Sequence, residues 1–75
     1  MIDSLVLIEG KDVKEEDLSI SLANALQLIV GSDNRFGIIV QISATTPDDL
    51  RNAIIEFSRV QNVTGVITLM LKSSL

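Results

Sequence analysis

The residues of this chain that could take part in chemistry are carboxylates, lysines, arginines, hydroxyls and amides, because the sequence contains no histidine, cysteine, tyrosine or tryptophan. Histidine-based acid–base catalysis, thiol nucleophiles and metal sites built on nitrogen or sulfur are therefore excluded. None of the remaining residues forms an evident acid–base pair. We expect a protein that is not an enzyme and that holds neither a cofactor nor a metal ion.

Three sets of polar residues could take part in binding or catalysis. Asp12 and the acids at positions 15–17 carry oxygen ligands, but their spacing matches no calcium loop, and acids are favoured at a solvated helix start. Asp48 and Asp49 are interpreted as helix-capping groups. Arg35, beside the turn-forming residues 31–34, has the fork geometry that binds phosphate or carboxylate, yet turn chemistry alone explains this cluster. The sequence therefore predicts no small-molecule site from charged groups.

Length and composition indicate one domain that associates with itself. The 75 residues form a single domain, residues 1–75, and 47% of them are hydrophobic. Without cysteine there is no disulfide to reinforce a core of this size. The aliphatic content exceeds what one small core hides, so we expect a homodimer.

The charge excludes two classes of partner. A net charge of −4 and only two phenylalanines argue against nucleic acid, which requires a basic surface or an aromatic platform. A membrane partner is not expected either, because anionic lipid also attracts basic surfaces and no apolar run is long enough to span a bilayer. Asp3 occupies the position where a secretory signal would be basic. We expect a soluble cytoplasmic protein.

The first half of the chain can be interpreted in two ways. Residues 2–8 are aliphatic on both faces, which predicts a strand at the centre of a sheet. From Leu18 onward, apolar residues recur at helical spacing, but Leu18, Ile20 and Leu22 also alternate with serines as in a strand. The preceding acids favour a helix over residues 13–25, followed by a short strand over 26–30. A longer helix running to Ile29 is the alternative.

The second half gives clearer signals. Residues 37–43 alternate as a strand, with Ile38, Val40 and Ile42 predicted to face the helices. Thr46 and Pro47 then form a helix start, and apolar residues recur at helical spacing to about position 60. A last strand is predicted over residues 66–71.

Together these elements predict an α+β fold, a ferredoxin-like plait of order βαββαβ. Its antiparallel sheet would have the first and third strands in the centre and two helices on one face. If the first helix runs to Ile29, the order becomes βαβαβ with three strands. In either case one sheet face would be open. The residues predicted to line that face, as a partner or dimer surface, are Val6, Ile8, Ile39, Gln41, Ser43, Val66, Thr68 and Met70.

Residues 36–71 also carry a family resemblance. A strand over 36–42, the helix start Thr46-Pro47-Asp48-Asp49-Leu50 and the segment 60–66 are similar to NapD-type maturation chaperones of periplasmic nitrate reductase. They resemble the effector domain of Lrp/AsnC regulators and ACT domains to a smaller extent. These resemblances imply non-catalytic binding, of a signal peptide in the first case and of a small metabolite at a subunit interface in the other two.

The function predicted from the sequence is a small non-catalytic binding or regulatory module. A NapD-like chaperone binding a peptide is the leading form, and the low pI suits a basic signal peptide. A metabolite-sensing module is the first alternative, with Gln41, Ser43, Thr68 and Arg35 as lining groups. An enzyme of the dimeric-barrel kind is the second, and the predicted open face offers it no acid–base pair.

Overall fold

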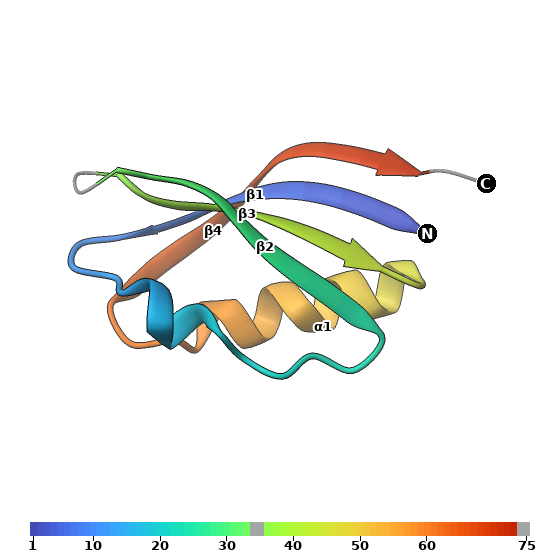
Figure 1. Ribbon diagram of the computed structural model, residues 1–75, viewed down its shortest axis with the longest axis horizontal. Coiled ribbons are helices and arrows are strands. Elements are labelled where there is room, and N and C mark those ends of the chain that lie inside the picture. The colour runs from blue at the N-terminus through green and yellow to red at the C-terminus, as the bar shows by residue number, and fades with distance from the viewer. Residues whose placement is uncertain (34–35, 74–75) are drawn as a thin grey trace.

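Four antiparallel strands form one sheet, which is packed against an α-helix on one side. The computed structural model describes residues 1–33 and 36–73. Its elements are β1 (Ile2–Gly10), the 3-10 turn η1 (Glu15–Leu18), β2 (Ala25–Asp33), β3 (Gly37–Ala44), α1 (Pro47–Ser58) and β4 (Val63–Ser73) (Figure 1). The strand order is β2-β3-β1-β4. The first and third strands therefore lie in the centre, as the sequence predicts.

The predicted two-helix plait is wrong, because residues 13–25 do not form a helix. They contain only η1 and an irregular segment that leads into β2. Leu18, Ile20 and Leu22 pack on the core while the serines between them are exposed, so the alternation of period two outweighs the helical spacing. Serine is a weak helix former, and Asn24 adopts a left-handed φ of 59°, a conformation that ends a helix.

The three-stranded alternative is wrong as well. β2 begins at Ala25 and runs to Asp33, so the strand predicted over 26–30 exists and is longer than predicted. Residues 31–33, interpreted above as part of a turn, continue β2 and pair with β3. Arg35, considered as an anion ligand, lies outside the described residues.

Helix α1 begins where the sequence predicts. The Thr46 hydroxyl accepts a hydrogen bond from the Asp49 backbone N–H at 3.2 Å and donates one to the Asp49 carboxylate at 2.9 Å. Pro47 occupies the first turn, where a backbone N–H would have no hydrogen-bond partner within the helix, so its absence costs no bond. Asp48 and Asp49 lie beside the positive end of the helix dipole, which confirms their role at the helix start.

Replacing Thr46 with alanine is expected to destabilise the protein by about 1 kcal/mol, the usual loss when an N-cap hydroxyl is removed. Thr46→Ser keeps the hydroxyl and should lie much closer to the parent protein. Urea unfolding followed by circular dichroism measures both variants. Equal losses for alanine and serine would show that the cap contributes nothing.

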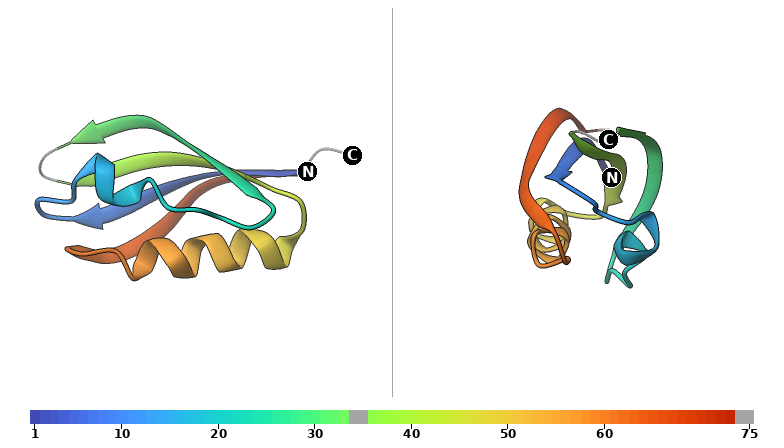
Figure 2. Two further views of the ribbon diagram at one scale, coloured as in Figure 1. Left: turned by 60° about the horizontal axis from the view of Figure 1, so that its bottom comes forward. Right: turned by 90° about the vertical axis from the view of Figure 1, so that its left-hand side faces the viewer.

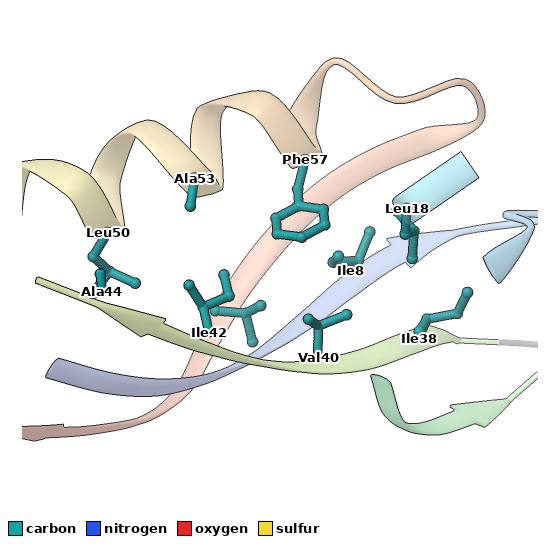
Figure 3. Close-up of a cluster of buried hydrophobic side chains, with 10 residues drawn as sticks. Ile8, Leu18, Ile38, Val40, Ile42, Ala44, Leu50, Ala53 and Phe57 are labelled. Atoms are coloured by element: carbon teal, nitrogen blue, oxygen red, sulfur yellow. The ribbon is translucent and has the colours of Figure 1, made fainter. Parts of the chain in front are cut away.

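The core lies between the sheet and α1, with η1 closing one end. Phe57 points from α1 toward the sheet, and Leu18 reaches the same layer from η1 (Figure 3). Ile38, Val40 and Ile42 face this layer, which confirms the predicted orientation of β3. The fully or almost fully buried apolar residues are Val6, Ile8, Leu18, Ile38, Val40, Ile42, Ala44, Leu50, Ala53 and Phe57.

Candidate functional site

One face of the sheet carries no covering layer among the described residues. The end-on view shows α1 and η1 on the same side of the sheet, α1 near β4 and η1 near β2 (Figure 2). Side chains alternate along a strand, so those between the buried positions point to the other side. We call that side the uncovered face. Its residues are Asp3, Leu5, Leu7 and Glu9 of β1, Leu26, Leu28 and Gly31 of β2, Ile39, Gln41 and Ser43 of β3, and Ile67, Met70 and Lys72 of β4.

The middle of the uncovered face is mainly apolar. One row across the strands aligns Leu28, Gln41, Leu5 and Met70, and the next aligns Gly31, Ile39, Leu7 and Ile67. The outer side chains are the most exposed, with 72% of Leu26, 62% of Leu28 and 57% of Met70 accessible to solvent. Monomeric soluble proteins rarely expose this many neighbouring aliphatic side chains on one surface.

Polar residues flank the apolar rows toward both ends of the strands. At one end the Ser43 hydroxyl donates a 2.7 Å hydrogen bond to the Asp3 carboxylate, and Lys72 lies opposite Asp3 in the strand register. At the other end Glu9 lies between two glycines, Gly37 and Gly65. An apolar centre with a polar rim is the usual arrangement of a protein–protein interface.

Four of the eight residues predicted for the open face lie on it: Ile39, Gln41, Ser43 and Met70. Val6 and Ile8 do not, because both are fully buried against α1 and η1. Leu5 and Leu7 take their places. The first strand is aliphatic on both faces, so its sequence does not say which face is covered. The register shows that Val6 and Ile8 share their side with Val40 and Ile38.

Val66 and Thr68 also lie on the covered side, because a β-bulge interrupts β4. Val6 pairs with Thr68 but Leu5 pairs with Met70, which leaves Leu69 as the extra residue. Alternation restarts after the bulge, so Met70 changes face relative to Thr68. The buried Ser4 hydroxyl donates a 3.0 Å hydrogen bond to the Met70 carbonyl and fixes the strand just after the bulge.

Two leucines of β2, Leu26 and Leu28, belong to the uncovered face although the sequence does not predict them there. Leu26 and Leu28 alternate with Gln27, a pattern that suggests Gln27 faces solvent. Gln27 instead points to the covered side, where its side-chain N–H donates to the Leu18 carbonyl at 2.5 Å. No local signal reveals this exchange of sides, because it depends on the contact between β2 and η1.

The charged groups of the described residues do not form a chemical site. Asp12 and the acids at positions 15–17 are exposed around η1. Within residues 1–33 and 36–73, no three or more acidic side chains come together as metal ligands would. Two arginines form exposed ion pairs along α1, Arg51 with Asp48 and the C-cap residue Arg59 with Glu56, both at 3.3 Å. The strongest candidate for function is therefore the uncovered face.

Similarity to known proteins and membrane topology give no further indication of function. No protein family, curated protein or solved structure matches the chain. In the part of the chain that is described, no helix has the length and apolar character needed to cross a membrane. The functional interpretation thus depends on the geometry and composition of the sheet.

Proposed function

We propose that this chain is a small, non-catalytic interaction module whose uncovered face packs against the same face of a second copy. The observation that carries the proposal is the apolar centre of that face, which extends over all four strands without a covering layer among the described residues. Two antiparallel sheets packed face to face interdigitate their side chains at a separation of about 10 Å. In such a dimer, the sheet of each copy would cover the uncovered face of the other.

The size of the face suits a dimer. The uncovered face spans four strands of 8 to 11 residues each. A standard interface buries about 800 Å² on each partner, which corresponds to about 20 to 30 residues. Burying the exposed part of one leucine such as Leu28 contributes about 1 to 2 kcal/mol.

The distribution of charge favours a second copy as the occupant. A net charge of −4 opposes self-association wherever acids meet. On the uncovered face the charged side chains lie toward the ends of the strands: Asp3, Glu9 and Lys72. The acids around η1 and at the start of α1 lie on the other side of the sheet (Figure 2). Two copies can therefore meet at their least charged surfaces.

The groups that the face presents support a non-catalytic role. Gln41, an amide, is the polar side chain in its middle, and the Ser43 hydroxyl and the Asp3 carboxylate at its end are hydrogen-bonded to each other. The cytoplasmic location expected from the sequence belongs to the same proposal, since a chain without cysteine suits a reducing compartment.

The test is the solution mass of Leu28→Glu, measured by light scattering beside the parent protein. A carboxylate in the apolar row would be buried without a partner in the dimer, so the variant should have half the parent mass. Asn52→Glu adds the same charge on an exposed part of α1 and should leave the mass unchanged.

Two results would contradict the proposal. An unchanged mass of folded Leu28→Glu would remove the uncovered face as a self-association surface. A parent protein that is already monomeric would leave the face free, and a peptide partner, as the NapD resemblance implies, would then be the better account of it.

A further inference from the structure

β4 is an edge strand whose apolar side chains are exposed on both faces. No strand lies beyond it in the order β2-β3-β1-β4. Ile67 and Met70 are 45% and 57% exposed on the uncovered face, while Leu71, which pairs with the buried Ser4, is 62% exposed on the α1 side. A strand that is apolar on both faces is typical of the interior of a sheet.

An apolar groove continues from Leu71 onto α1. It has a volume of about 410 Å³ and lies between the end of β4 and the first turns of the helix. Arg51, paired with Asp48, stands at its rim. The apolar lining residues are Ile2, Pro47, Leu50, Ile54, Ile55 and Leu71. Apolar surface therefore runs from the uncovered face around the free edge of β4 into this groove.

The other edge strand is different. The α1 side of β2 is closed, because Ala25, Gln27 and Ile29 are partly buried beneath η1 and the segment that follows it. The hydrogen bond from Gln27 to the Leu18 carbonyl fastens this cover to the strand. β2 thus exposes apolar side chains on one face, whereas β4 exposes them on two.

The edge of β4 also has few of the features that prevent strands from pairing between molecules. Edge strands are commonly protected by charges, proline or β-bulges. Residues 63–71 contain no charge and no proline, although a bulge lies at Leu69, and the charge at Lys72 is opposed by Asp3 in the register. The net charge of −4 therefore resides elsewhere, and two β4 edges can approach one another without bringing acids together.

We propose that β4 pairs antiparallel with β4 of a second copy, joining two four-stranded sheets into one continuous sheet of eight strands. The free N–H and C=O groups of each β4 edge become hydrogen-bonded, and the strand added beside Leu71 covers part of the groove. This contact is separate from the packing of the uncovered faces and does not depend on it. When both two-fold contacts form with their axes crossing at right angles, they close a tetramer.

Hydrogen exchange in the parent protein tests the edge without any substitution. Beyond Val63, whose N–H bonds to the Val60 carbonyl, the amides of β4 that point away from β1 lie on the free edge, both in a single chain and in a dimer formed through the uncovered faces. Edge pairing should protect them increasingly as the protein concentration rises, when measured by NMR. If they exchange as fast as the exposed loop amide of Lys11 at every concentration, the edge proposal is wrong.

Solution masses separate this contact from the proposed function. Leu71→Glu places a carboxylate on the α1 side of β4 and leaves the uncovered face intact, so it should halve the parent mass. Leu28→Glu should also halve it, and the double variant should be a single chain of 8.1 kDa. If folded Leu71→Glu retains the parent mass, the edge contact is absent. If only Leu71→Glu lowers the mass, the edge contact stands and the face contact fails.

Discussion

Replacing Phe57 with alanine is expected to lower the free energy of unfolding by about 3 to 5 kcal/mol. Phe57 is fully buried and is among the largest side chains between α1 and the sheet. Removing a buried phenylalanine costs about 3 to 5 kcal/mol in lost transfer energy and cavity formation. A domain of 75 residues has a total stability of about 4 to 11 kcal/mol, so this single loss removes a large part of it.

Ile55→Ala is the matched control, because Ile55 lies two positions earlier on the same helix and is 40% exposed. We expect it to lose no more than about 1 kcal/mol, since a partly exposed residue leaves no closed cavity. Urea unfolding at one fixed protein concentration measures both variants. Similar losses at the two positions would contradict the placement of Phe57 at the centre of the core.

Gly37→Ala is the second substitution with a large expected effect. Gly37 opens β3 with φ at 133°, a conformation that residues with a Cβ rarely adopt. An added Cβ would lie 1.9 Å from the Ile8 carbonyl oxygen, well inside contact distance, and that oxygen belongs to the central strand β1. Backbone must move to relieve the clash, so we expect a loss of about 3 kcal/mol or more.

Gly31→Ala tests whether the loss comes from this geometry rather than from adding a methyl group to a strand. The nearest atom to a Cβ at Gly31 is Cδ1 of Ile39 at 4.0 Å, which is ordinary contact. Because alanine also has the smaller unfolded-state entropy, this variant should be neutral or slightly more stable. Thermal unfolding ranks the two proteins. A Gly37→Ala protein as stable as Gly31→Ala would contradict the close approach of β1 and β3 at this end.

The sequence predicts the second half of the chain well because its signals are local. The cap at Thr46 and Pro47 requires only neighbouring residues, and α1 starts there. The orientation of β3 follows from alternation, which holds without a bulge through its pairing with β1. Core residues such as Val40 and Phe57 could therefore be assigned from spacing alone.

The errors occur where tertiary contacts decide between patterns of equal local strength. Residues 18–22 satisfy both helical and alternating spacing, and packing of Leu18 on the sheet selects the extended form. In β4 the alternation rule fails at Leu69, because the bulge is fixed by the Ser4 hydroxyl from another strand. For this reason Val66 and Thr68 are predicted on the open face, although they lie on the covered side.

Alternation in the sequence places the residues of the third strand on the uncovered face, as the register has them, and misses those of the second strand. Ile39, Gln41 and Ser43 were placed on it from β3 alone, but the leucines of β2 were not. The side chain of Gln27 reverses the apparent polarity of that strand by bonding to η1. The resemblance to NapD-type chaperones, Lrp/AsnC effector domains and ACT domains stays a prediction.

The most direct test of the central claim is the solution mass of the parent protein over a wide range of concentrations. Packing of uncovered faces between copies predicts an even multiple of the 8.1 kDa chain mass, which falls only on strong dilution. A mass of 8.1 kDa at every concentration would contradict self-association. The apolar face would then be free in the isolated chain, and its occupant would have to be another molecule.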